Sequence, residues 1–242
     1  MLKHLKISIF ILGLTAVNSS DAQMKIQYGI STGCSLQYRA LSFDKNNDEL
    51  GINQLIVDSR ERLEKVDFRP RIGFDFKLNF NNKIGLKSGV SYDLKGYKTK
   101  GDFYSLTSGG AVLLFSFVAN EFSHCIGVPT LFSMKIPFTK NTMEINFGAT
   151  HNFYIGSSTF SKQIFPTETV KDVTSGSYGN SRYIGQGAIE LNFLFVPFAN
   201  NNELYIGSDF KFGYNSISGQ TPIKEYIFST GINMGFTFGK KE

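Results

Sequence analysis

The chain has 242 residues, of which 19% are charged and 14% are aromatic, with 24 Phe, 11 Tyr and no Trp. Soluble domains carry about 25% charged residues, so this composition is poor in charge and rich in aromatic rings. The net charge of +5 is small and no stretch concentrates Lys and Arg, so we expect no nucleic-acid partner. Beyond the N-terminal region no apolar run approaches the ~18 residues of a spanning helix, which excludes a helical membrane protein.

The N-terminal segment has the three parts of a secretory signal peptide. A short basic start precedes the apolar residues 7–17, and small residues then lead to a cleavage site between Ala22 and Gln23. The apolar part is too short to span a membrane. We therefore expect residues 1–22 to be a signal peptide and residues 23–242 to form one exported domain.

The dominant period of the remaining sequence is two, which indicates β-strands. Near the C-terminus, large apolar residues such as Phe228 and Ile232 alternate with small or polar residues such as Ser229 and Asn233. A strand sorts such residues onto opposite faces, whereas a helix scatters them around its circumference. Segments of this kind, each long enough to cross a bilayer as a tilted strand, cover residues 25–38, 69–80, 84–95, 124–136, 144–155, 183–195, 204–215 and 226–239.

The connections between these segments alternate between short and long. Long connections follow the first, third and fifth segments, at roughly residues 40–67, 98–121 and 156–182. Short turns at one end and long loops at the other are typical of outer-membrane barrels, with both chain ends in the periplasm. We therefore predict an all-β fold, an eight-stranded antiparallel up-and-down transmembrane β-barrel. The first long connection is expected to form a short helix or an extended hairpin.

Aromatic residues mark the predicted outer end of every segment. A Tyr ring is apolar and its hydroxyl is polar, so it favours the headgroup level of a membrane. These residues predict a girdle, which comprises Tyr38, Phe68, Tyr97, Phe122, Tyr154, Tyr183, Tyr214 and Tyr226.

Charged residues occupy many of the predicted inward positions. Eight strands enclose a space that side chains just fill, which disfavours a conducting pore. An unpaired buried charge costs several kcal/mol, so these residues are expected to form ion pairs with one another. A three-residue turn between the second and third segments places Arg71 opposite Asp93. The predicted lumen network comprises Arg71, Lys77, Lys87, Asp93, Glu190, Asp209 and Lys211.

Two hairpins bring like charges face to face. The turn lengths place Lys77 opposite Lys87 and Glu190 opposite Asp209. Directly opposed like charges are destabilising. The two hairpins lie across the lumen from each other, so we predict that the two lysines neutralise the two carboxylates.

The sequence offers few groups for catalysis. Glu190 and Asp209 are of the types that form acid/base pairs, but a closed lumen denies substrate access, so we interpret them as structural. His151 lies mid-strand on the lipid face. His124 lies near an outer strand end and is the candidate for a Ser–His–acid triad. The histidines and cysteines form no metal-ligand spacing. We expect no enzymatic activity, no cofactor and no metal.

Three stretches resemble the PorT-like outer-membrane β-barrel family. They are the glycine-rich segment 86–98 with its Lys-Gly step, the aliphatic–Pro–aliphatic segment 126–131 and the closing residues 231–236. The family often has an acidic residue just before its fourth strand, where this chain has residues 124–127, His-Cys-Ile-Gly. The resemblance implies the barrel fold, and one branch of the family is linked to protein secretion across the outer membrane.

The function favoured by these observations is a non-enzymatic scaffold or binding protein of the outer membrane that presents surface loops. Its expected partners are outer-membrane lipid and, through the loops, lipopolysaccharide, another envelope protein or a host surface, with envelope assembly or protein secretion as roles. Two alternatives stay open. One is a rim-located lipid-modifying enzyme, and the other is a soluble lipocalin-like binder, which needs an apolar interior.

Overall fold

The structure is a computed structural model that describes residues 24–43, 51–107, 110–138, 141–176, 182–195, 202–216 and 222–239. The predicted signal peptide and its cleavage site between Ala22 and Gln23 lie outside the described residues.

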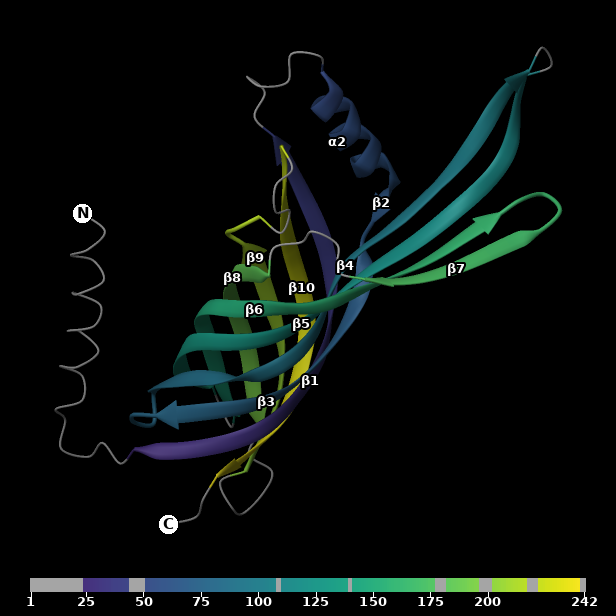
Figure 1. Cartoon of the computed structure of the whole chain (residues 1–242). Helices are drawn as coiled ribbons and strands as arrows, with labels where there is room; N and C mark the ends of the chain where they lie inside the picture. Colours follow the sequence, from purple (N-terminus) through teal and green to yellow (C-terminus); the bar gives the residue numbers. More distant parts are fainter. Residues whose placement is uncertain are drawn as a thin grey trace.

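Eight long antiparallel strands in the described residues close into a barrel (Figure 1). They are β1 (Lys25–Phe43), β3 (Asp67–Asn79), β4 (Ile84–Thr107), β5 (Gly110–Phe138), β6 (Asn141–Ile164), β8 (Tyr183–Phe195), β9 (Glu203–Gly213) and β10 (Ile223–Gly239). Each pairs with the next along the chain, and β1 pairs with β10 to close the ring. The predicted eight-stranded antiparallel up-and-down β-barrel is confirmed.

The barrel wall is apolar outside and polar inside, as the alternation predicts. On β10 the outward side chains of Ile232 and Met234 are 60% and 49% exposed, whereas Asn233 between them is 1% exposed. The interior holds buried lysines, carboxylates and amides from every part of the ring. A soluble lipocalin-like barrel needs the opposite arrangement, so the structure does not support that alternative.

Two of the eight predicted girdle residues face the wrong way. The outward ones are Tyr38, Phe68, Phe122, Tyr183, Tyr214 and Tyr226. Tyr97 continues the inward alternation of Lys95 and lies beneath the guanidinium of Arg39, 3.6 Å from the ring centroid. Tyr154 pairs with the buried Cys125, next to a register shift in the β5–β6 ladder. The prediction considered only the height of these residues, whereas strand alternation decides which face they occupy.

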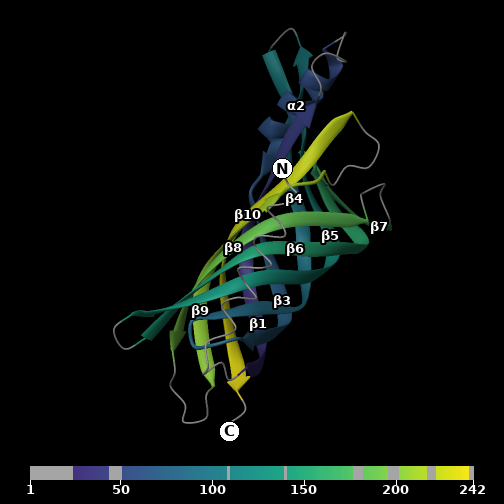
Figure 2. The ribbon, with the colours of Figure 1, turned by 90° about the vertical axis from the view of Figure 1, so that its left-hand side faces the viewer.

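The second and third long connections are strands, so the prediction of loops there is wrong. β4 and β5 continue as one hairpin to Thr107 and Gly110, and the far end of β6 pairs with β7 (Thr169–Gly176). β5 and β6 stay paired up to Ser116 and Ile164. Together these strand ends form a four-stranded extension, here called the outer sheet (residues 98–107, 110–121, 157–164 and 169–176). Figures 1 and 2 show it leaving the barrel and leaning away from it.

The first long connection contains a helix, one of the two forms expected. α2 (Ile52–Leu63) stands above one end of the barrel and leads into β2 (Glu64–Lys65), which pairs with β4 (Figure 1). A Cβ added to Gly101 would lie 2.6 Å from a methyl carbon of Leu63, so the end of α2 packs tightly on the outer sheet. Neither α2 nor any other helix in the described ranges has the length and apolar character needed to cross a bilayer.

Candidate functional site

The lumen contains an ion pair that spans from one wall to the other. Lys77 and Lys87 lie directly opposite each other on β3 and β4, the register that the turn length predicts. The Nζ atom of Lys87 lies 2.8 Å from Oε2 of Glu190 on β8, and both side chains are almost fully buried. Oδ2 of Asp75 lies 3.8 Å from the same ammonium. One of the two lysines therefore neutralises a carboxylate across the lumen.

Lys77 binds a different carboxylate from those predicted. Its Nζ atom lies 2.7 Å from Oε2 of Glu144 on β6, and the hydroxyl of Ser133 donates to the other oxygen at 2.6 Å. The prediction that Lys77 neutralises Glu190 or Asp209 is wrong. Barrel strands tilt, so residues equally distant from their turns do not lie at equal heights. The tilt brings Glu144 to the level of Lys77.

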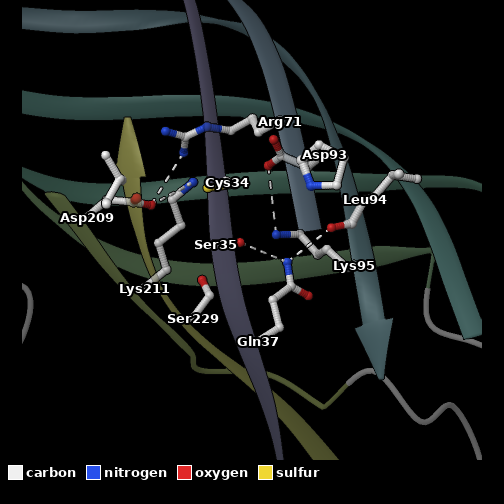
Figure 3. A pocket seen from close by; sticks show the side chains of 12 residues that line it. Cys34, Ser35, Gln37, Arg71, Asp93, Leu94, Lys95, Asp209, Lys211 and Ser229 are labelled. Atoms are coloured by element: carbon white, nitrogen blue, oxygen red, sulfur yellow. Dashed lines mark hydrogen bonds and ion pairs between the residues drawn. The ribbon is translucent and has the colours of Figure 1, made fainter. Parts of the chain in front are cut away.

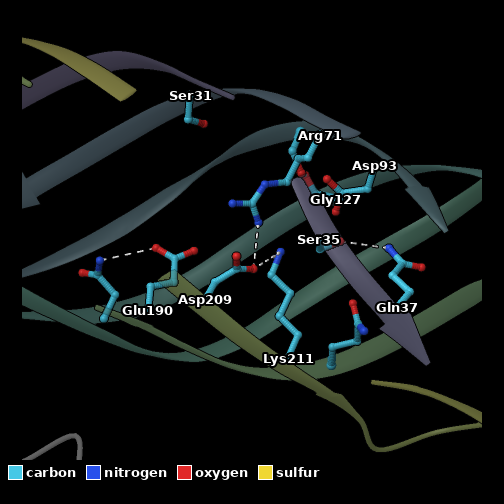
Figure 4. A network of polar contacts seen from close by, with 12 residues as sticks. Ser31, Ser35, Gln37, Arg71, Asp93, Gly127, Glu190, Asp209 and Lys211 are labelled. Atoms are coloured by element: carbon cyan, nitrogen blue, oxygen red, sulfur yellow. Dashed lines mark hydrogen bonds and ion pairs between the residues drawn. The ribbon is translucent and has the colours of Figure 1, made fainter. Parts of the chain in front are cut away.

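A second group of charges surrounds Asp209 (Figure 3). Arg71 and Lys211 approach one carboxylate oxygen of Asp209, with N–O distances of 3.5 and 3.7 Å. Arg71 is in register with Asp93, as predicted, yet its ion pair goes to Asp209. The nearest ammonium to Asp93 is that of Lys95, at 3.8 Å. Figure 4 shows Arg71, Asp209 and Lys211 converging within the barrel. The seven predicted residues all lie on the lumen side of the strands, and their contacts divide between the group around Lys77 and Lys87 and the group around Asp209.

Sequence reasoning missed the aromatic centre of this network. The hydroxyl of Tyr205 donates to Asp75 at 2.6 Å, and the side chain is 1% exposed. The ammonium groups of Lys77 and Lys87 lie 5.1 and 5.2 Å from the ring centroid, a distance typical of cation–π contacts. A Cβ added to Gly235 would lie 2.4 Å from the ring, so glycine makes the space that Tyr205 fills. The alternation of Tyr205 with the outward residues Leu204 and Ile206 on β9 could have shown that its side chain points into the lumen.

A second charged cluster closes the outer end of the barrel and is here called the mouth cluster. Arg39 on β1 forms ion pairs with Glu64 of β2 and with Glu225 of β10, the latter at 2.7 Å. Arg60 of α2 reaches the other oxygen of Glu225, also at 2.7 Å. The cluster ties the helix and β2 to the barrel rim. Because its members come from distant parts of the chain, no spacing in the sequence pointed to it.

The two histidines of the described chain form contacts on the outer surface of the barrel. His124 Nδ1 lies 2.5 Å from the hydroxyl of Tyr92, and its Nε2 lies 3.1 Å from Oγ of Ser158. His151 Nδ1 lies 2.7 Å from the hydroxyl of Tyr183. The predicted triad candidate therefore lies beside a serine, but a tyrosine occupies the place of the acid. No group of three metal-ligating side chains occurs among the described residues.

Comparisons with known proteins give structural similarity alone. No protein-family model matches the chain, and no curated protein matches it. Neisserial surface protein A is 12% identical and has a TM-score of 0.39, covering 87% of this chain and 96% of its own. Ail, the attachment invasion locus protein of Yersinia pestis, is 14% identical with a TM-score of 0.30, covering 86% and 97%. The outer membrane protein OprG from Pseudomonas aeruginosa is 13% identical with a TM-score of 0.36, covering 89% and 95%.

Proposed function

We propose that this protein is an outer-membrane barrel that serves as a non-enzymatic binding platform, with the outer sheet and α2 as its working surface. The observation that carries this proposal is the contrast between the two parts of the molecule. The lumen is filled by side chains that contact one another. Strands β4, β5 and β6, in contrast, extend at their outer ends far beyond the length needed to cross a bilayer.

The filled lumen argues against transport through the barrel. The Lys77–Glu144 and Lys87–Glu190 pairs cross the interior and Tyr205 lies between them. Breaking a buried ion pair leaves an uncompensated charge, which is strongly unfavourable. An ion or solute would have to separate these pairs in order to pass.

The outer sheet has the surface of a contact site. Large apolar side chains are exposed on it, including Phe103 at 47% and Val112 at 52%. Exposed apolar patches on a folded protein mark interaction surfaces. The paired strands and the stacked rings of Phe103 and Phe115, 4.7 Å apart, give this surface a fixed shape.

The proposal is tested by fractionation, gel mobility and conductance of the full chain together with a variant that lacks most of the outer sheet. In this variant an Asn-Gly turn joins Thr99 to Ala119 and another joins Thr159 to Thr174. Both turns keep the existing cross-strand pairs. We expect both proteins to sediment with outer membranes, to migrate faster when unboiled and to give no conductance steps in planar bilayers. Conductance by the full chain, or a soluble full chain, would contradict the proposal.

We further propose membership of the PorT-like family, which the stretches 86–98, 126–131 and 231–236 support. A role in envelope assembly or protein secretion accords with a platform on the outer face. Deletion of the gene in the source bacterium, followed by comparison of the secreted proteins, tests this role.

A second candidate function is a rim-located lipid-modifying hydrolase, and the His124–Ser158 contact favours it. Nε2 of His124 is placed to accept the proton of the Ser158 hydroxyl at 3.1 Å, as a general base does. The test is labelling with a serine-reactive fluorophosphonate. Labelling of the full chain that is lost in Ser158→Ala but kept in the neighbouring Ser175→Ala would establish this activity. Equally weak labelling of all three proteins would exclude Ser158 as the nucleophile of a hydrolase.

A further inference from the structure

One face of the outer sheet carries a row of lysines with no carboxylate between them. Lys100 on β4 pairs with Val118 on β5, Val118 pairs with Lys162 on β6, and Lys162 pairs with Lys171 on β7. Directly paired residues of adjacent strands share one face, so the three lysines form a single line across four strands. Lys162 and Lys171 are immediate neighbours, an arrangement that is destabilising for like charges.

The next row toward the barrel also contains two lysines that face each other on adjacent strands. Lys98 on β4 lies directly opposite Lys65 on β2. The strand residues of this face in the described chain include one carboxylate, Asp102, one row farther out. Asp172 pairs with Ser161 on the opposite face, so it does not neutralise the row. Charge repulsion therefore persists on this face in the protein alone, and an anion would relieve it.

No ion pair joins Lys100, Lys162 or Lys171 to another described residue, and all three side chains are exposed. Adjacent strands lie about 4.8 Å apart. Lys162 and Lys171 are therefore spaced to bind one phosphate between them. Lys100 lies two strands, or about 10 Å, from Lys162. At that distance it could bind a second phosphate group.

Apolar side chains flank the lysine row. Phe160 and Val173 lie directly opposite each other in the row nearer the barrel and are 46% and 63% exposed. Ile164, in the row beyond, is 37% exposed. Basic residues beside exposed aromatic and aliphatic ones are the composition of surfaces that rest on the interface of a membrane.

The orientation of this face follows from strand alternation. Along β4 the outward positions run from Val90 and Tyr92 on the barrel wall to Lys98 and Lys100 on the outer sheet. The lysine face is therefore the continuation of the lipid-facing side of the barrel. Because the outer sheet leans away from the barrel, this side becomes its underside (Figure 1). In a barrel that spans a membrane, the underside would face the surrounding membrane surface.

We propose that the underside of the outer sheet binds the phosphate groups of lipids in the leaflet around the barrel, with Lys100, Lys162 and Lys171 as ligands. This inference rests on the proposed function, which places the barrel in an outer membrane. Lysine binds phosphate as a point charge, and each lysine near an anionic headgroup adds to the attraction. Phe160 and Val173 would then insert between the headgroups.

The test measures binding of dihexanoyl phosphatidic acid to the full chain in uncharged maltoside micelles by isothermal titration calorimetry. The lysine variant is K162Q/K171Q. The matched control is K25Q/K83Q, which removes two exposed lysines at the opposite end of the barrel. We expect a loss of affinity on the order of tenfold in K162Q/K171Q and no change in the control. The charge-keeping variant K162R/K171R should bind like the full chain.

Other outcomes would overturn the proposed lipid site, and a second measurement distinguishes its failure from failure of the proposed barrel function. Equal binding of the lipid by all variants, or equal binding of inorganic phosphate and the lipid, would overturn the inference. Gel mobility before and after boiling is recorded for each protein. If the full chain shows no heat-dependent shift, the proposed barrel function fails. If the shift is present but the lysines do not affect binding, the lipid site alone fails.

Discussion

Lys87 of β4 and Glu190 of β8 form an ion pair across the lumen, with 2.8 Å between Nζ and Oε2 and less than a tenth of either side chain exposed. The two residues lie 103 positions apart in the sequence. Each belongs to a hairpin in which its direct cross-strand neighbour has the same charge, Lys77 or Asp209. Contacts across the lumen therefore neutralise charges that repel their direct neighbours within each hairpin.

The first prediction concerns the two sides of this pair. Lys87→Met leaves both Glu190 and Asp75 without the ammonium, whereas Glu190→Gln leaves Lys87 with Asp75 at 3.8 Å. We expect Lys87→Met to lower the free energy of unfolding by about 3–5 kcal/mol and Glu190→Gln to lower it less. Urea unfolding in lipid vesicles measures both changes. Equal or reversed costs would show that Asp75 does not share the lysine.

The second prediction concerns the space for Tyr205. A Cβ at position 235 would lie 2.4 Å from the ring, so Gly235→Ala should displace it and cost about 1–3 kcal/mol. Adding Tyr205→Leu should recover part of that cost, since a smaller side chain tolerates the methyl group. Gly156→Ala is the control, because no atom lies within 4 Å of its added Cβ. The same urea titration applies, and an unchanged stability in Gly235→Ala would refute the packing.

The third prediction concerns the mouth cluster. Glu225→Gln removes the carboxylate that Arg39 and Arg60 share, so α2 should detach from the rim more often. We expect faster trypsin cleavage after Arg60 and Arg62 while the barrel keeps its gel mobility. Leu55→Ala, which alters an exposed side chain of the same helix away from both cleavage sites, should leave the cleavage rate unchanged. The same cleavage rate in Glu225→Gln and the full chain would show that other contacts hold the helix.

The barrel was predictable because its wall obeys one local rule. Alternation of residues such as Ile232 and Asn233 assigns each position to a face, and the turn lengths set the registers of Arg71 and Lys77. These features depend on nearest neighbours along the chain or across one turn.

The parts that were missed depend on geometry beyond one hairpin. The Lys77–Glu144 pair follows from strand tilt, which the sequence does not display. The mouth cluster joins α2 to β10, which lie far apart in the sequence. The outer sheet was missed because its alternation is weak, since aromatic rings such as Phe103 and Phe115 stack on the inward face in place of polar residues.

We propose that a filled barrel anchors the outer sheet in the outer membrane. The measurement that tests it most directly is fractionation of expressing cells followed by gel electrophoresis with and without boiling. We expect the protein to sediment with outer membranes and to migrate faster when unboiled. Recovery of the protein in the soluble fraction, with the same mobility before and after boiling, would contradict it.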